Sequence, residues 1–283
     1  MSYITALDEH GYIRFDEAQC RAAGKALHDD YVSASPFPHA VIDDFLDIDL
    51  LRRVRAGYPT LDGHTAFDRA QERLKYQFHP KDVPSPLVRN LLDALNSQAM
   101  IGFLEEIAGI KGLIADPYFT GGGLHETRRG GHLGIHADFN IHPRMKVERR
   151  LNLLVYLNDD WQADYGGDLE LWDTKMKACE KKVAPLIGRA VLFSTTLDSF
   201  HGHPEPLNCP PDMARRSIAL YYYTAFPDGV AKAPKRTTHF APRPGSTDKV
   251  DWQVRARHLM NDWVPPALLR LAGRLKGSKR AEG

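Results

Sequence analysis

The 283-residue sequence is poor in cysteine and has no excess of either charge, and both features exclude classes of protein. Its three cysteines, Cys20, Cys179 and Cys209, are an odd number without a short paired spacing. This pattern argues against a disulfide framework and against a zinc site, and it favours reduced thiols. The 37 basic and 36 acidic residues give a formal charge of +1, so the overall charge gives no reason to expect nucleic acid or another anionic partner.

Long apolar segments and repeats are also missing. No apolar run is long enough to span a bilayer. The N-terminus lacks the basic, apolar and small-residue pattern of a secretory signal. With 43% hydrophobic and 26% charged residues, the composition is that of an ordinary globular protein. We therefore expect a cytoplasmic protein, for which the sequence carries no signal of a particular oligomeric state.

The first part of the chain has apolar residues at helical spacing. We expect helices around Asp16–Asp30, from a cap at Asp43 and Asp44 to about Arg55, and from Pro86, with one break, to Ala108. A short strand is expected at Ala40–Ile42, whereas residues 60–80 are polar and are expected to be irregular.

From Gly112 onward, short strands and turns replace the helical spacing. Leu151–Leu157 is the clearest strand, and further strands are expected at Leu169–Trp172, Ala190–Phe193 and Arg215–Thr224. Several strands joined by short turns predict a barrel or a double-sheet jelly roll. The fold class is therefore mainly β with flanking helices.

These patterns divide the chain into three parts that are expected to form one structural domain. Residues 1–110 form a helical part that packs on the core, residues 111–228 form the jelly-roll core, and residues 229–283 form a basic C-terminal extension. The extension contains an expected helix near Trp252–Trp263 and a basic, leucine-containing end. For this end, packing on the domain or a dimer contact is favoured over contact with a membrane surface.

The triplet His136-Ala-Asp138 is the strongest chemical signal in the core. Residues i and i+2 of a strand point to the same face, and His201 would add a third ligand from a later strand. Two histidines and one carboxylate on one face of an iron leave the opposite positions open, as in non-heme Fe(II) oxygenases. The triplet alone is a weak signal, because His-x-Asp is common by chance. His203 is either a further pocket residue or a loop residue.

The last predicted strand contains two arginines, Arg215 and Arg216, that must face opposite ways. Arg215 shares its face with small and polar residues such as Ser217, which suit the lining of a cavity. We therefore choose Arg215 as the fixed cation for the carboxylate of an organic co-substrate. Asn152 and Tyr156 are assigned to the same cavity, although a core tyrosine bonded to a backbone carbonyl is an equal alternative for Tyr156.

From His136 to Tyr223 the sequence resembles the prolyl 4-hydroxylase-type Fe(II)/2-oxoglutarate dioxygenases. Four pieces match in order: His136-Ala-Asp138, then Leu154-Val-Tyr156-Leu-Asn158-x-x-Trp161 running to Gly166-Gly167, then Phe200-His201-Gly202, then Arg215-x-Ser217-Ile218. The resemblance implies a double-stranded β-helix, which is a cupin-like jelly roll. It implies that His136, Asp138 and His201 hold Fe(II), and that Arg215 and Tyr156 bind the distal carboxylate of 2-oxoglutarate.

The sequence departs from the family pattern at three places. Glu126 stands where a tyrosine is often found, His203 stands where an aliphatic residue is common, and the gap between His201 and Arg215 is longer than usual. These departures bear on which substrate binds more than on whether iron binds. Candidate pocket residues are Asn140, His125, Glu126, Arg128, Arg129, Trp172 and His203.

The activity implied by the resemblance is hydroxylation of an unactivated C–H bond, with 2-oxoglutarate and O₂ converted to succinate and CO₂. Ascorbate is a candidate reductant. The substrate is a small molecule or a peptide, and peptidyl proline, an amino acid and a sugar or lipid-linked intermediate all remain candidates. Two alternatives stay open: a cupin-type metalloenzyme that does not use 2-oxoglutarate, and a non-catalytic jelly-roll binding module.

Overall fold

The computed structural model describes residues 2–10, 12–227 and 235–249. The helix expected near Trp252–Trp263 and the leucine-containing end lie outside the described residues. Among the described residues, none of the helices has both the length and the apolarity needed to span a bilayer.

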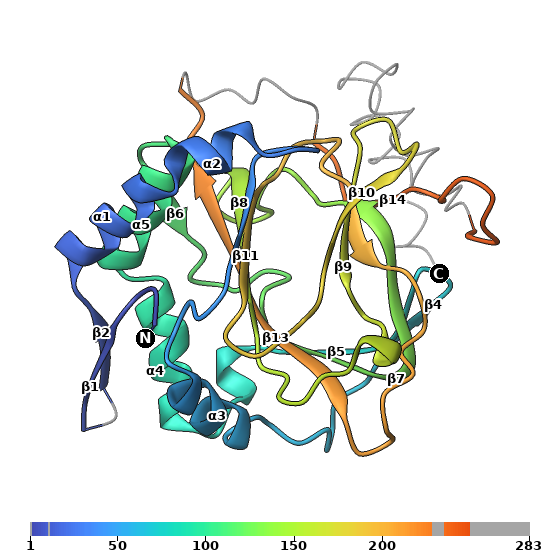
Figure 1. Cartoon of the computed structure of the whole chain (residues 1–283), viewed down its shortest axis with the longest axis horizontal. Coiled ribbons are helices and arrows are strands. Elements are labelled where there is room, and N and C mark those ends of the chain that lie inside the picture. The colour runs from blue at the N-terminus through green and yellow to red at the C-terminus, as the bar shows by residue number, and fades with distance from the viewer. Residues whose placement is uncertain (1, 11, 228–234, 250–283) are drawn as a thin grey trace, which may run out of the picture.

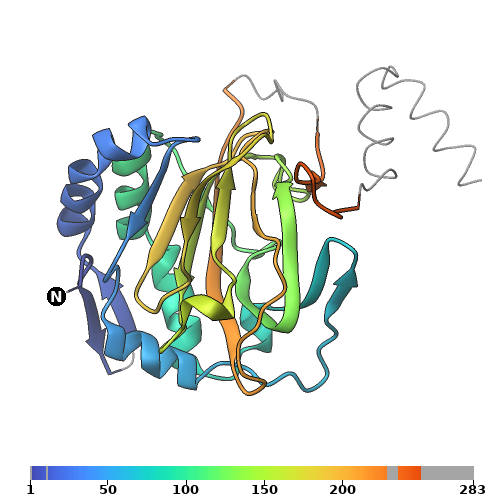
Figure 2. The same ribbon diagram turned by 45° about the vertical axis from the view of Figure 1, so that its right-hand side comes forward.

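A layer of helices from the first part of the chain covers one side of the molecule (Figure 2). The helices are α1 (Glu17–Ala26), α2 (His28–Ser33), α3 (Ile48–Ala56), α4 (Pro86–Leu95) and α5 (Gln98–Ala108), with short 3₁₀ turns η1 (Pro80–Asp82) and η2 (Ala163–Tyr165). The predicted helices and the break after α4 are confirmed. Ser85 and Ser97 cap α4 and α5 through their side chains, so the break separates two independently capped helices.

The predicted cap of α3 is wrong. The side chain of Asp47, rather than that of Asp43 or Asp44, accepts the hydrogen bond from Leu50 N in the first turn. Asp43 instead forms an ion pair with Arg189, and Asp44 has a positive φ of 49° in the preceding turn. Any of several aspartates just before a helix can cap it, and the turn that joins the strand to the helix decides which of them does.

The strands form a nearly closed antiparallel barrel of the jelly-roll type (Figure 1). They are β1 (Ala6–Glu9), β2 (Tyr12–Phe15), β3 (His39–Ile42), β4 (Phe67–Arg69), β5 (Glu72–Phe78), β6 (Ile114–Ala115), β7 (Gly123–Ala137), β8 (Glu148–Tyr156), β9 (Leu169–Trp172), β10 (Cys179–Val183), β11 (Ala190–Ser194), β12 (His201–His203), β13 (Ala214–Thr224) and β14 (His239–Phe240). β1 and β2 pair separately from the main sheet. The predicted fold class is confirmed.

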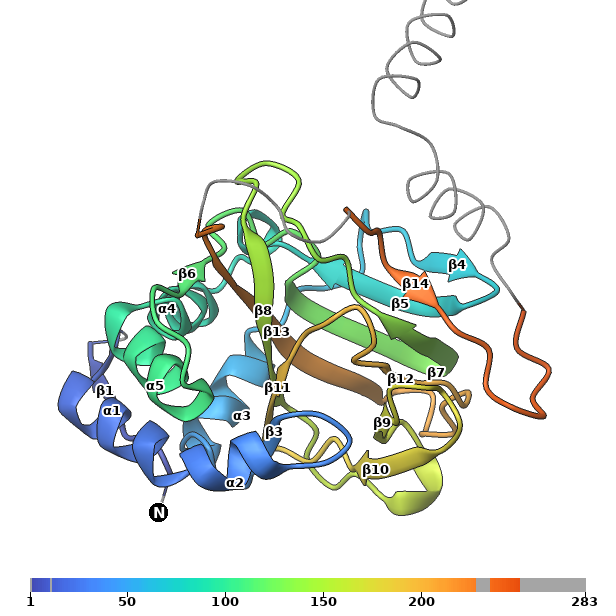
Figure 3. The same cartoon turned by 90° about the horizontal axis from the view of Figure 1, so that it is seen from above.

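The main sheet runs in the order β10-β9-β12-β7-β13-β8-β11-β3, and β5 adds to β7. The long strand β7 pairs with β13 through its first half and with β12 near its end, so it belongs to both halves of the barrel (Figure 3). Gly130, with a φ of +78°, and Gly131 lie between these two parts of β7. A Cβ on Gly131 would lie 2.7 Å from the Arg73 carbonyl oxygen, so the close pairing with β5 needs glycine there.

The expectation of irregular structure over residues 60–80 is wrong, because β4 and β5 form a hairpin there. Along β5, Lys75 and Gln77 face the central pocket, while Tyr76 and Phe78 pack against the main hydrophobic core. A strand whose inner face meets a polar pocket lacks the hydrophobic run that marks a core strand. The alternation is present but is easily taken for a polar loop.

The main core lies between the helices and the outer face of β8 and β13. Leu151, Leu153 and Val155 of β8 are fully buried in a cluster that includes residues of α3, α4 and α5. The intervening residues of β8 therefore point into the barrel, as the alternation of the sequence predicts. The division of the chain into three parts stays a prediction; β3, β5 and β14, which come from its outer parts, are strands of the same sheet as the core.

Candidate metal and co-substrate site

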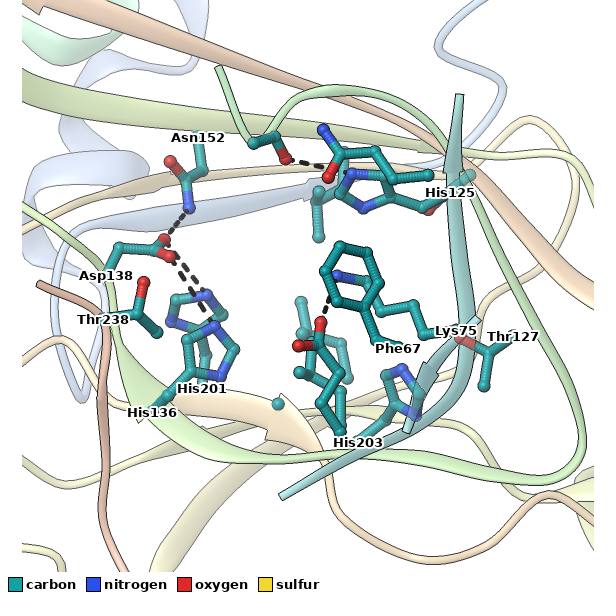
Figure 4. Close-up of a pocket in the computed structure, with 18 of the residues that line it drawn as sticks. Phe67, Lys75, His125, Thr127, His136, Asp138, Asn152, His201, His203 and Thr238 are labelled. Atoms are coloured by element: carbon teal, nitrogen blue, oxygen red, sulfur yellow. Dashed lines mark hydrogen bonds and ion pairs between the residues drawn. The ribbon is translucent and has the colours of Figure 1, made fainter. Parts of the chain in front are cut away.

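Three side chains converge at one end of the central pocket (Figure 4). His136 is near the end of β7, Asp138 follows that strand directly, and His201 opens β12. His136 and His201 are paired across β7 and β12, with ring centroids 4.5 Å apart. One potential ligand atom from each of the three residues lies within 4.8 Å of the others. The β-ladder thus brings together the residues that the sequence predicted as metal ligands.

Both imidazole rings are oriented by backbone carbonyls. His136 Nδ1 lies 2.9 Å from Gly134 O and His201 Nδ1 lies 3.0 Å from Ser199 O, so each Nδ1–H donates to a carbonyl. The Nε2 atoms then carry lone pairs and lie 3.7 and 3.5 Å from the Asp138 carboxylate. Burial, and then the adjacent His136, lower the pKa of His201 to about 4. Two neutral imidazoles and a carboxylate fit a divalent iron.

Asp138 is held by two neighbours on strand β8. Asn152 Nδ2 donates to Asp138 Oδ2 at 2.8 Å, and Arg149 Nη2 lies 2.9 Å from the same oxygen. Burial alone would raise the pKa of Asp138, but the charge of Arg149, with smaller contributions from His201 and His136, holds that pKa well below its usual range. The carboxylate is therefore ionised and ready to accept a cation.

Arg149 is the functional residue that sequence reasoning missed. Its guanidinium is buried and lies 3.4 Å from the ring centroid of Tyr221 and 4.7 Å from that of Phe139. Its Nε donates to Asn152 Oδ1 at 2.9 Å, which joins Arg149, Asn152 and Asp138 in one network. The assignment of Asn152 to the co-substrate stays a prediction, and the contact seen here is with Asp138. Strand alternation from Asn152 would place Arg150 on the pocket face, but a register shift between Leu151 and Arg149 brings Arg149 there instead.

The two consecutive arginines of β13 lie on opposite sides of the sheet. Arg215 is buried in the pocket, where its Nε donates to Gly167 O at 2.7 Å and its Nη2 donates to the Tyr156 hydroxyl at 3.2 Å. Arg216 faces away from the pocket and forms an ion pair with Glu126 at 2.7 Å. Arg215 lines the pocket, whereas Tyr156 does not and contacts the pocket only through the Arg215 guanidinium. The assignment of both residues to the co-substrate stays a prediction.

The pocket has a volume of about 240 Å³ and extends from the three converging side chains to Arg215. Of the candidate pocket residues, His125 and His203 line it. Asn140, Glu126, Arg128, Arg129 and Trp172 do not line it, and these expectations are wrong. Glu126 alternates with His125 and Thr127 along β7, so its side chain points to the opposite face. The hairpin β4–β5 and the segment around β14 contribute lining residues that the sequence did not indicate: Phe67, Arg69, Glu72, Lys75, Gln77, Thr238 and Phe240.

Comparison with known proteins finds a family match over the part of the chain that carries this site. Residues 122–223 match the family model of the 2OG-Fe(II) oxygenase superfamily, and they include His136, Asp138, His201 and Arg215. This match and the three converging side chains support the predicted oxygenase class and its dependence on Fe(II) and 2-oxoglutarate.

Individual relatives are more distant. Mouse prolyl 3-hydroxylase OGFOD1 is 24% identical over 242 residues, which are 83% of this chain and 40% of that protein. The chain thus spans less than half the length of this relative. A prolyl-4-hydroxylase from Pseudomonas putida superposes with a TM-score of 0.51 at 19% identity, over 71% of this chain and 98% of the other. A prolyl hydroxylase from Trichoplax adhaerens, solved with a hypoxia inducible factor peptide, has a TM-score of 0.50 at 15% identity, over 73% and 91% of the two chains. These two structures show the shared fold.

Proposed function

We propose that this oxygenase hydroxylates an unactivated C–H bond of a prolyl residue in a peptide. In this proposal His136, Asp138 and His201 hold Fe(II), and Arg215 and Tyr156 bind the distal carboxylate of 2-oxoglutarate. The observation that carries it is the convergence of three donor atoms within 4.8 Å, in a pocket that also holds Arg215. When bound, iron and 2-oxoglutarate supply the activation of O₂ that yields succinate, CO₂ and a hydroxylated product.

The residues of the chain orient the reactants and keep them apart from bulk water. The backbone carbonyls at Gly134 and Ser199 keep the Nε2 lone pairs of the two histidines directed at the cation. The guanidinium of Arg215 is fixed by Gly167 O, and a planar cation in a fixed position suits a carboxylate better than a flexible ammonium does.

One feature of the pocket supports a prolyl peptide as substrate. The side chains of Phe67, Phe139, Tyr221 and Phe240 line the pocket, and such an aromatic wall suits an apolar ring. The mouse relative named as a prolyl 3-hydroxylase matches over a longer stretch than the family model does, which supports the same substrate class.

An anaerobic titration tests the metal and co-substrate assignments. Fe(II) and then 2-oxoglutarate are added to the protein, and the weak visible charge-transfer band of a chelated keto acid is followed. We expect the band in the wild type, its loss in Asp138→Ala and its weakening in Arg215→Ala. Arg216→Ala is the matched control, because Arg216 lies outside the pocket, and it should keep the band. Metal binding without a band would favour a cupin-type enzyme, and absence of both would favour a binding module.

A second experiment tests the substrate. Short proline-containing peptides and matched peptides with alanine in place of proline are incubated with the enzyme, Fe(II), 2-oxoglutarate and O₂. We expect some proline peptides to stimulate succinate formation and to gain one oxygen atom by mass spectrometry. Stimulation by a free amino acid or a sugar, and by none of the peptides, would overturn the prolyl assignment while leaving the oxygenase class intact.

A further inference from the structure

The hairpin β4–β5 brings two side chains of β4 to the mouth of the central pocket. Phe67 and Arg69 are two residues apart on this strand, so they share a face, and both line the pocket. Asp68 points to the opposite face, where it lies 3.8 Å from Arg73. Phe67 is partly buried beside Lys75 (Figure 4), whereas the side chain of Arg69 is exposed. An exposed residue that also lines the pocket lies at its opening, where a substrate enters.

The guanidinium of Arg69 has no anionic partner. Its Cζ lies 5.9 Å from the centroid of the Phe67 ring, and Lys75 Nζ lies 5.4 Å from the same centroid. Among the described residues, none forms an ion pair or a hydrogen bond with the Arg69 side chain. A guanidinium carries five N–H donors in one plane and matches a carboxylate through two parallel hydrogen bonds. Arg69 is thus positioned by an aromatic ring, and its N–H donors are free for a ligand.

Arginine and lysine side chains outnumber carboxylates in the lining of the pocket. The four cations are Arg69, Lys75, Arg149 and Arg215, and the two anions are Glu72 and Asp138. Lys75 Nζ lies 2.8 Å from Glu72 Oε1. Arg149 Nη2 lies 2.9 Å from Asp138 Oδ2. In the proposed function, Arg215 binds the distal carboxylate of 2-oxoglutarate.

Loading the site does not remove this excess of positive charge. Fe(II) and 2-oxoglutarate carry opposite charges of equal size, so their sum leaves the charge of the pocket unchanged. Arg69 is then the pocket cation for which neither the described residues nor the co-substrate supplies an anion. A mouth with an unbalanced cation attracts a negatively charged substrate and orients it on entry.

We propose that Arg69 binds a carboxylate of the substrate at the mouth of the pocket, so that the enzyme prefers prolyl residues with an acidic group close by. This inference rests on the proposed function and names the peptides that it takes. The carboxylate belongs either to an aspartate or glutamate beside the target proline or to the C-terminus of the peptide, and both present the same chemistry to a guanidinium. Arg69 determines specificity and takes no part in the reaction at the metal.

The test uses short peptides with one central proline, acetylated at the N-terminus and amidated at the C-terminus. Glutamate, glutamine or lysine is placed at each position beside the proline in turn, and a further peptide keeps a free C-terminal carboxylate. Binding to the protein loaded with Mn(II) and 2-oxoglutarate is measured by anaerobic calorimetry, and kcat/KM is measured with Fe(II) from succinate formation. We expect a carboxylate at one of these places to raise both quantities about fivefold over its neutral counterpart, the effect of a good exposed ion pair. The place that gives the gain distinguishes a side chain from the C-terminus.

Variants at two arginines of the hairpin connect the preference to Arg69. Arg69→Gln should bring the ratio between the acidic and the neutral peptide close to one, and Arg69→Glu should favour the lysine peptide. Arg73→Gln is the matched control and should keep the preference, because Arg73 is an exposed arginine of the same hairpin that pairs with Asp68 and does not line the pocket. Added salt should weaken the preference of the wild type, because it screens the attraction between exposed charges.

The outcomes separate this inference from the proposed function. If the wild type treats acidic and neutral peptides alike, or if Arg69→Gln keeps the full preference, the role of Arg69 is overturned, while hydroxylation of the proline peptides leaves the proposed function standing. If no proline peptide binds or stimulates succinate formation although the keto-acid band forms, the prolyl substrate itself is overturned, and the role of Arg69 with it.

Discussion

Two buried histidine–aspartate pairs lie close together in the sequence and have opposite roles. His136 Nε2 is 3.7 Å from Asp138 Oδ1 at the pocket, and His142 Nε2 is 3.2 Å from Asp116 Oδ1 in an enclosed cluster. His142 is fully buried, and neither it nor Asp116 lines the central pocket. Judged by distance alone, His142 and Asp116 would be a better candidate for a metal site than His136 and Asp138.

The difference lies in which ring nitrogen carries the proton. His142 Nδ1 accepts hydrogen bonds from the backbone N–H groups of Arg144 and Met145, at 3.2 and 2.9 Å, so its proton is on Nε2. That nitrogen lies 3.2 Å from Asp116 Oδ1 but does not form a hydrogen bond with good geometry to it. At His136 the proton is on Nδ1 and the Nε2 lone pair faces the carboxylate. A lone pair that faces a carboxylate can bind a cation together with it, whereas a ring nitrogen that already carries a proton has no lone pair to offer a metal. The Asp116 carboxylate is satisfied by the backbone N–H groups of Tyr118 and Thr120. The direction of the lone pair therefore distinguishes a metal site from a structural pair.

The largest expected effect comes from removing the pocket histidine. His136→Ala should weaken Fe(II) or Mn(II) binding by more than about a hundredfold, because loss of a mere supporting residue already costs about 10- to 100-fold. Metal stoichiometry after dialysis and calorimetric titration would measure this. His142→Ala is the matched control, since it removes a histidine of similar burial. Equal loss of metal by both variants would show that the two histidine–aspartate pairs do not differ in metal binding.

The enclosed pair should instead control stability. His142→Ala leaves the buried N–H groups of Arg144 and Met145 without their acceptor. We expect the free energy of unfolding to fall by roughly 2 to 4 kcal/mol, the cost of two unsatisfied buried groups. Urea denaturation of the metal-free protein measures it. His136→Ala should lower stability by less, and a larger loss in that variant would contradict the distinction.

A smaller effect on metal affinity is expected from substituting Arg149, which contacts Asp138 and is not itself a proposed metal ligand. Arg149→Met removes the charge that outweighs burial at Asp138, so the pKa of that carboxyl should rise. A folded-state pKa below the ordinary value keeps the carboxylate ionised as the pH falls, and this advantage is lost in the variant. Metal affinity at neutral pH should fall by about 10- to 100-fold, as for other supporting residues, and more steeply in acid. A titration at several pH values that gives parallel curves for both proteins would refute this role.

The convergence of the two histidines with Asp138 and the pocket-facing position of Arg215 could be predicted because they depend on strand alternation. The i, i+2 spacing places His136 beside Asp138, and the small neighbours of Arg215 distinguish its face from that of Arg216. The order of motifs then identified His201. Alternation is a local property, so these assignments needed no knowledge of how distant segments pack.

Contacts between distant segments could not be predicted in the same way. Arg149 reaches Asp138 only because the loop after β7 turns back onto β8, and Asp116 meets His142 across another loop. The hairpin β4–β5 was missed because its pocket-facing side chains, such as Lys75, are polar. A polar pocket in the barrel thus hides the strands that line it, and only the three-dimensional pairing shows them.

The smallest expected effect concerns a further buried histidine, His39 of β3, and the pH dependence of the free energy of unfolding. Its Nδ1–H donates to Phe37 O at 2.9 Å. Burial lowers its pKa below 6.5, which the Phe37 carbonyl opposes and Lys181 reinforces.

The unfolded chain therefore binds a proton on His39 at pH values where the folded chain does not. Its contribution to stability is complete above the unfolded pKa of about 6.5 and declines as the pH falls. Between about pH 7 and about pH 5, the wild type should lose stability relative to His39→Gln in urea denaturation. A difference that stays constant over this range would show that His39 takes up a proton as readily in the folded barrel as in the unfolded chain.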